Sequence, residues 1–181
     1  MNVSYIIIND LSEMDWDDLY ERCRADIDAQ WPAASTLTSE ERKANMLAVI
    51  ESGMNNEWPG LNPHEPNDRY LMAKIVDLDT GQDMGFVSGF ILEDGTLDGR
   101  HMLTAPDENG SRNWLYENKT ARNNFHLSIG VTKILYRNIS ANSIYYKILR
   151  SRAAAGALEL VEDVDSPMYG PAFRNVLIRH L

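Results

Sequence analysis

The sequence predicts a protein of the α/β (α+β) class, with a mixed, mostly antiparallel central sheet and helices on both faces. Short apolar segments rich in β-branched residues recur along the whole chain and are bounded by turn residues. Longer segments with apolar residues at helical spacing alternate with them. A length of 181 residues with 44% hydrophobic residues is enough for one packed core. We therefore expect a single domain over residues 1–181.

Two helices are expected in the first third, and each has a start signal. Ser12 is expected to cap the first helix, which Pro32 ends because proline cannot continue a helix. Thr38 and Glu41 have the spacing of a capping box at the start of the second helix, which extends to Gly53. The residues expected to face inward on the second helix are Ala44, Leu47 and Ile50.

The remaining elements follow from apolar runs between turn residues. Gly85 and Gly89 lie inside one expected strand, where glycine permits close approach of another backbone or a bulge. A single helix is expected from about Asn113 to Ile129, ended by Gly130. The strands are expected at residues 3–8, 70–78, 84–92, 97–104, 134–136, 158–164 and 173–181. The predicted order is β-α-α-β-β-β-α-β-α-β-β.

A proline-rich stretch from Met54 to Asp68 separates the second helix from the next strand. Structureless loops of this length are usually functional or disordered. Trp58, Leu61 and His64 are therefore candidates to line a substrate pocket, and an ordinary surface insertion is an equally good interpretation.

Composition excludes several classes of function. The net charge of −10 argues against a nucleic-acid groove, which needs a basic surface, and indicates either solubility or a basic ligand. The four histidines lack the spacing of metal ligands, so no metal is expected. One cysteine, Cys23, excludes an intrachain disulfide and fits a reducing, cytoplasmic environment. We expect neither a signal peptide nor a membrane-spanning segment.

The most specific stretch runs from Lys133 to Leu149. It begins as a buried strand, turns at Asn138 and Ser140, which are good N-cap residues, and continues as a helix. Asn138, Ala141 and Tyr145 have the spacing N-x-x-A-x-x-x-Y. This resembles the strand-to-helix junction of the GNAT superfamily, the N-acetyltransferases that use acetyl-CoA, and the predicted element order is also that of the GNAT fold.

The resemblance implies roles for single residues. It implies that Asn138 contacts the cofactor and that Tyr145 is the general acid, which a phenol with a pKa of about 10 suits. The alternative interpretations are that Asn138 is a turn residue and that Tyr145 is an aromatic residue of the core. It also implies that the end of a central strand, Leu103, Thr104 and Ala105, contacts the acetyl carbonyl. Glu93 is a candidate general base by position only, and a solvated turn carboxylate is the alternative. The Gly-Phe pair usual after the tyrosine is replaced by Leu149 and Arg150.

The family's pyrophosphate loop has the pattern Q/R-x-x-G-x-G/A, and backbone amides at a helix N-terminus bind the phosphates there. The corresponding cofactor-binding residues here are Asn109, Gly110, Ser111 and Arg112. Gly110 matches the first glycine, whereas Asp107 replaces the basic or amide residue and Arg112 replaces the second small residue. The acids Asp107 and Glu108 repel phosphate unless they point away, and Arg112 could compensate for them.

Two functions follow from this resemblance. The first is an acyltransferase that moves an acetyl group from acetyl-CoA directly to an amine of a small molecule or a protein. The second is a GNAT-fold protein without catalysis, as found in phage and virus particles, which binds an assembly partner and has a degraded pyrophosphate loop. An open V between the fourth and fifth strands, with unpaired amides at Asn109 to Arg112, would favour the enzyme. A cleft plugged by Trp114 or by the Arg112 side chain would favour the second function.

Overall fold

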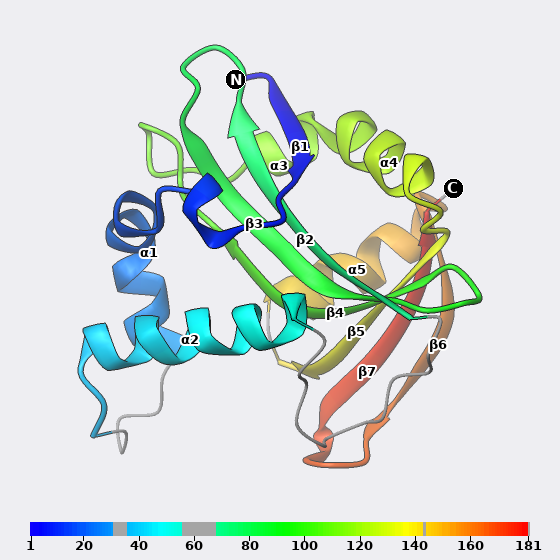
Figure 1. Ribbon diagram of the computed structural model, residues 1–181. Helices are drawn as coiled ribbons and strands as arrows, with labels where there is room; N and C mark the ends of the chain where they lie inside the picture. Colours follow the sequence, from blue (N-terminus) through cyan, green and yellow to red (C-terminus); the bar gives the residue numbers. More distant parts are fainter. Residues whose placement is uncertain (31–35, 56–67, 143, 181) are drawn as a thin grey trace. The chain divides into compact units, whose positions relative to one another are not determined.

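The computed structural model describes residues 1–30, 36–55, 68–142 and 144–180 (Figure 1). Within these residues, strands form one sheet in the order β1-β2-β3-β4-β5-β7-β6. β4 pairs with β5 in parallel, whereas the β1–β2, β5–β7 and β6–β7 pairs are antiparallel. The strands are β1 (Val3–Ile7), β2 (Arg69–Asp77), β3 (Asp83–Ile91), β4 (Thr96–Thr104), β5 (Lys133–Ser140), β6 (Leu158–Ser166) and β7 (Gly170–His180). The predicted mixed sheet is confirmed, and so is the predicted succession of strands and helices along the chain, apart from one expected helix that is divided in two.

The described helices are η1 (Leu11–Glu13), α1 (Trp16–Gln30), α2 (Ser39–Met54), α3 (Trp114–Glu117), α4 (Lys119–Ser128) and α5 (Ile144–Ala154). The prediction that Ser12 caps the first helix is wrong. Asp10 caps the short 3₁₀ turn η1, and its carboxylate accepts from the Ser12 N–H at 2.7 Å. The α-helix begins one turn later, where the Asp15 carboxylate accepts from the Asp18 N–H at 3.1 Å. Pro32 lies outside the described residues.

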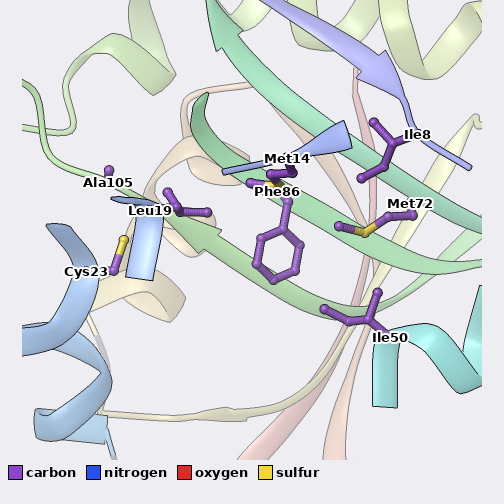
Figure 2. Packing of buried hydrophobic residues seen from close by; sticks show 8 residues of the cluster. All are labelled: Ile8, Met14, Leu19, Cys23, Ile50, Met72, Phe86 and Ala105. Carbon is purple, nitrogen blue, oxygen red and sulfur yellow. The ribbon is translucent and has the colours of Figure 1, made fainter. Parts of the chain in front are cut away.

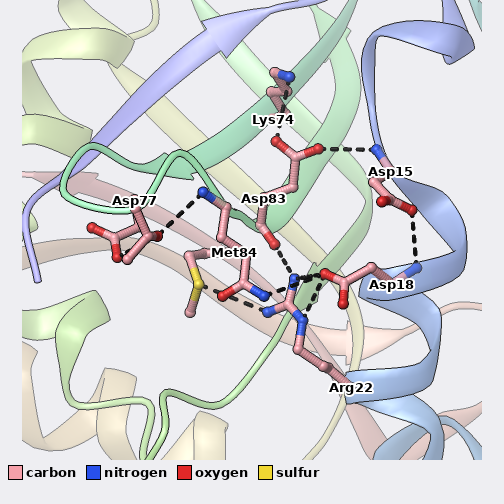
Figure 3. Close-up of polar contacts among 9 residues, drawn as sticks. Asp15, Asp18, Arg22, Lys74, Asp77, Asp83 and Met84 are labelled. Atoms are coloured by element: carbon pink, nitrogen blue, oxygen red, sulfur yellow. Dashed lines mark hydrogen bonds and ion pairs between the residues drawn. The ribbon is translucent and has the colours of Figure 1, made fainter.

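A buried carboxylate joins the start of α1 to β3, as Figure 3 shows. Asp83 Oδ2 accepts from the Asp15 N–H at 3.0 Å, and Asp83 Oδ1 lies 3.3 Å from Lys74 Nζ. Arg22 donates to the backbone carbonyl of Asp83 and pairs with Asp18 at 2.7 Å. Because an acid at a helix N-terminus also offsets the helix dipole, Asp83 both positions α1 and stabilises its first turn.

Helix α2 confirms the predicted capping box. The Glu41 N–H donates to Thr38 Oγ1 at 3.3 Å, and the Thr38 N–H donates to Glu41 Oε2 at 2.7 Å. The predicted inward face is only partly right, because Ile50 is buried whereas Ala44 is exposed.

The expected helix over residues 113–129 is interrupted at Asn118, which separates α3 from α4. The Asn118 side chain donates to the Trp114 carbonyl at 2.9 Å and accepts from the Val3 N–H at 3.2 Å. An asparagine that bonds to nearby backbone in this way favours a helix end over a helix interior. The apolar spacing predicted helical residues correctly but did not show this break.

The chain divides into two compact units, and β3 and β4 contribute residues to both. Within the described part, the first unit comprises residues 1–30, 36–55, 70–88 and 101–122, and the second comprises residues 68–69, 89–100, 123–142 and 144–180. The core of the first unit surrounds Phe86, whose ring meets Trp16 edge-on at 5.2 Å between centroids. Figure 2 shows its buried residues, Ile8, Met14, Leu19, Cys23, Ile50, Met72, Phe86 and Ala105.

The second unit has its own buried apolar residues. Helix α5 contacts both β5 and β6. The buried apolar residues of this unit include Leu97, Ile134, Leu149, Leu158, Val176 and Ile178.

Gly85 and Gly89 confirm the predicted close approach of another backbone. A Cβ atom at Gly85 would lie 2.4 Å from the Leu103 carbonyl oxygen, and one at Gly89 would lie 2.3 Å from the Asp98 carbonyl oxygen. Both distances are far shorter than van der Waals contact, so only glycine lets β3 lie this close to β4.

Candidate functional site

The loop after β4 is anchored at both ends within the first unit. At its start, the Ala105 N–H donates to the Met84 carbonyl at 2.8 Å. At its end, Trp114 Nε1 donates to the Ala105 carbonyl at 3.2 Å, and the buried indole packs with Val3, Ile75 and Met84. Arg112 Nε donates to the Thr104 carbonyl at 2.9 Å. The end of β4 and the residues after the loop are therefore held together.

Inside the loop, the carboxylate of Asp107 accepts hydrogen bonds from the loop's own backbone. Asp107 Oδ1 accepts from the Asn109 N–H at 2.9 Å and from the Ser111 N–H at 2.8 Å. The backbone carbonyl of Asp107 accepts from the Gly110 N–H at 2.9 Å. The amides of Asn109, Gly110 and Ser111 thus all donate to Asp107.

These are the amides from which a pyrophosphate site was expected. The half-buried Asp107 carboxylate faces these amides, and Glu108 is exposed. The helix after the loop, α3, has only 4 residues, so it contributes little of the dipole that helps long helices bind anions. The loop fits a pyrophosphate group only if the Asp107 carboxylate leaves, and the amides of Asn109, Gly110 and Ser111 are paired, whereas the enzyme hypothesis expects unpaired amides.

Asn138 lies within β5, so the expectation that Asn138 and Ser140 cap a helix is wrong. Asn138 has a φ of 56° at a bulge where the β5–β7 register shifts. Its N–H donates to Asn175 Oδ1 at 2.9 Å, and its Oδ1 accepts from Ser166 Oγ at 2.6 Å. Ser166 in turn accepts from the Tyr169 N–H at 3.1 Å. These contacts make Asn138 part of the support for the β6–β7 turn, and its contact with a cofactor stays a prediction.

Tyr145 lies in the first turn of α5, and its side chain is outside the described part of the structure. Its role as general acid stays a prediction. The following residue, Tyr146, donates its hydroxyl to Asp163 Oδ2 at 2.7 Å.

Two charge clusters around largely buried carboxylates were not predicted from the sequence. Asp98 on β4, with 2% of its side chain exposed, accepts from Arg137 Nε at 2.7 Å and from Arg100 at 3.0 Å. The hydrogen bond to Asp98 is the main influence that raises the pKa of Arg137. An acid at position 98, inside a predicted strand and next but one to Arg100, is the signal that could have indicated this cluster.

The second cluster lies around Asp163 on β6. Its carboxylate accepts from Arg174 Nε at 2.8 Å and from Arg150 at 3.1 Å, in addition to Tyr146. Burial is the largest single influence and by itself raises the pKa of Asp163. The hydrogen bonds from Arg174, Tyr146 and Arg150, together with the positive charge of Arg174, outweigh it, so the pKa is lowered. This network ties α5 to β6 and β7.

The remaining candidates are spread along the chain. Glu93 is an exposed residue in the turn before β4, whereas Leu103, Thr104 and Ala105 are at or just beyond its other end. A strand of 9 residues is roughly 25–30 Å long, so strand geometry does not favour Glu93 as a base beside Ala105. Trp58, Leu61 and His64, the candidates for a substrate pocket, lie outside the described residues.

Neither a metal centre nor a membrane span is found in the described ranges. They contain no group of three or more His, Cys, Asp or Glu residues able to hold a metal ion. No helix in them is long and apolar enough to cross a membrane.

Comparison with known proteins gives a clear result only for structure. No protein-family model matches the chain, and no curated protein sequence does. The GCN5-related N-acetyltransferase from Kribbella flavida is 16% identical, covers 99% of this chain and 98% of its own, and has a TM-score of 0.52. The ribosomal-protein-S5-alanine acetyltransferase from Vibrio fischeri is 14% identical, the match covers 97% of this chain and 91% of the other, and the TM-score is 0.53. The aminoglycoside acetyltransferase AAC(6')-Ib, in complex with coenzyme A and kanamycin, is 13% identical. The match covers 98% of this chain and 94% of the other, with a TM-score of 0.55.

These similarities extend over nearly the full length of each chain. The chain therefore has the fold of the GNAT N-acetyltransferases, and the resemblance drawn from the junction and the element order is confirmed at the level of the fold.

Proposed function

We propose that this protein is an acyltransferase that moves an acetyl group from acetyl-CoA to an amine. The observation that carries the proposal is the fold, shared over 98% of this chain with an acetyltransferase whose structure holds coenzyme A and an amine substrate. A shared fold does not define a reaction, so the proposal also depends on the residues that this chain places at the candidate site.

Each residue has a proposed part. Asn109, Gly110, Ser111 and Arg112 would hold the pyrophosphate of the cofactor once the loop is open, and Leu103 to Ala105 with Asn138 would contact its acetyl end. Acetyl-CoA would supply the activated acetyl group, and the chain's own contribution would be to position it and the amine. Tyr145 is the proposed general acid. Glu93 remains the candidate base by its position in the sequence alone.

The acceptor is proposed to be an amine of a small molecule or of a protein. The related structures are named for aminoglycoside, spermidine and ribosomal-protein substrates, all of which offer amines. A net charge of −10 attracts cationic amines over long range. Cys23, the single cysteine of the sequence, is buried, which is compatible with the proposed reducing, cytoplasmic location.

A second candidate is a non-catalytic GNAT-fold protein that binds an assembly partner. One observation favours it: the amides of Asn109 and Ser111 already donate to Asp107. In such a protein the loop would be a structural turn, with no requirement to bind phosphate.

The first test is transfer of labelled acetyl groups from acetyl-CoA to spermidine, kanamycin and an N-terminal alanine peptide, with calorimetric titration of acetyl-CoA alongside. The acyltransferase proposal predicts transfer to at least one amine. Tyr145→Phe should lower kcat by about 100-fold or more and change the KM for acetyl-CoA by less than about threefold, because a general acid acts in the chemical step.

Tyr116→Phe on α3 is the matched control, because it removes the hydroxyl of an exposed tyrosine. Equal loss in both variants would contradict the role of Tyr145. No transfer and no binding, in the wild-type protein and in a variant whose loop has been opened, would reject the acyltransferase in favour of the non-catalytic protein.

A further inference from the structure

In the loop over residues 107–111, the carboxylate of Asp107 is already bound to backbone amides of the same loop. Asp107 Oδ1 accepts from two backbone N–H groups, at 2.9 and 2.8 Å. Converging amides of this kind bind carboxylate and phosphate oxygens by the same charge-assisted hydrogen bonds. A phosphate oxygen and the Asp107 carboxylate therefore cannot use these two donors at the same time.

We propose that Asp107 is an intramolecular competitor that closes this loop to phosphate-bearing ligands. This inference rests on the proposed function, because it names the loop as the place where coenzyme A would bind. In the closed state the Asn109 and Ser111 amides are occupied by Asp107, and the negative charge of Asp107 also repels a phosphate. Coenzyme A binds at the loop only when the Asp107 side chain has turned away.

The anchors of the loop explain why the side chain, and not the whole loop, is the part that changes. Ala105 and Trp114 are both buried, with exposed fractions of 0% and 1%, and the Trp114 indole bonds to the Ala105 carbonyl. Arg112 is bonded to the carbonyl of Thr104. With both ends fixed, rotation of the Asp107 side chain is the smallest movement that frees the two amides.

Glu108 provides a matched control in the same loop. It has the same charge, is adjacent in sequence, and is exposed. Asp107→Ala removes one charge and frees two amides, whereas Glu108→Ala removes one charge and frees none. The difference between the two variants isolates the effect of the carboxylate that occupies the amides.

The experiment is calorimetric titration of the full-length wild-type protein, Asp107→Ala and Glu108→Ala with coenzyme A, and separately with inorganic pyrophosphate. Asp107→Ala should bind coenzyme A at least about tenfold more tightly than the wild-type protein, since two charge-assisted hydrogen bonds no longer have to be broken. The affinity of Glu108→Ala for coenzyme A should be within about threefold of that of the wild-type protein, because an exposed charge contributes little to binding. The three proteins should rank in the same order by their affinity for inorganic pyrophosphate.

Amide hydrogen exchange supplies a second measurement that does not depend on affinity. In Asp107→Ala the amides of Asn109 and Ser111 should exchange faster than in the wild-type protein, and coenzyme A should slow them again. In Glu108→Ala their exchange should match the wild-type protein. Thermal unfolding curves of the three proteins establish that each is folded.

Different results would overturn the competitor role of Asp107 and the proposed function. Equal tightening in the two variants, weaker binding by Asp107→Ala, or no protection of the two amides by coenzyme A would overturn the competitor role. If the wild-type protein binds coenzyme A as tightly as Asp107→Ala and transfers acetyl groups, the proposed function stands and the competitor role fails. If none of the three proteins binds coenzyme A or pyrophosphate, both proposals fail.

Discussion

Asn138 shows how one side chain can decide local structure. Its φ of 56° is in the left-handed region, which asparagine tolerates better than most residues. The bulge that this φ permits places the Asn138 amide group against Ser166, 28 residues further along the chain. A residue that resembles a ligand contact in sequence therefore has a structural partner here, and Asn138 variants would report on stability as well as on binding.

Asp163 leads to a pH-dependent prediction. Because its pKa is lowered in the folded protein, its contribution to stability is present above the unfolded-state pKa of about 3.9 and is lost as the pH falls through the lower folded-state value. Asp163→Asn should be less stable than the wild-type protein at pH 7, and the difference should narrow below about pH 4. Urea unfolding at pH 7, 5, 4 and 3 measures this.

Asp165→Asn is the control for this prediction. Asp165 also pairs with Arg174, but 56% of its side chain is exposed, so solvent screens the pair and its loss should matter less. A wild-type-to-Asp163→Asn difference that stays constant from pH 7 to pH 3 would contradict the assigned role of the carboxylate.

At the scale of elements, the contact between β3 and β4 depends on glycine. Gly89→Ala should lower the free energy of unfolding by more than about 2 kcal/mol, because its Cβ would lie 2.3 Å from the Asp98 carbonyl oxygen and the strands would have to separate. Chemical denaturation measures the change.

Gly99→Ala is the matched control on β4. Its Cβ would meet the Leu135 carbonyl oxygen at 3.6 Å, an ordinary contact, so we expect a change of less than about 1 kcal/mol. If the two alanine variants lose similar stability, close approach is not the reason for glycine at position 89.

At the scale of the whole molecule, two compact units share strands. β3 contributes residues 83–88 to the first unit and 89–91 to the second, and β4 is divided between them in the same way. A strand cannot easily lose half of its ladder while the other half stays paired. We therefore keep the prediction of a single domain and expect one cooperative unfolding transition, with equal calorimetric and van't Hoff enthalpies. Two resolved transitions in scanning calorimetry would contradict it.

The sequence by itself determined the features whose signals are local. The capping box joins Thr38 and Glu41, which are only three positions apart, and the strands follow from short apolar runs, so both were predictable. The order of these elements predicted the GNAT fold. Gly85 and Gly89 were predictable as places of close approach because no other residue suits that role.

Only the tertiary structure decided which polar groups meet. Asp98 and Arg137 are 39 residues apart, and Asn138 and Asn175 are 37 apart, so no local pattern relates them. Asp107 and its partners are close in sequence, but whether a loop carboxylate points toward the backbone amides or toward water depends on the loop's conformation. That conformation depends on Trp114 and Arg112, which are bonded to the end of β4. The sequence therefore placed acids in the loop after β4, and in the folded chain one of them, Asp107, accepts hydrogen bonds from the amides of that loop.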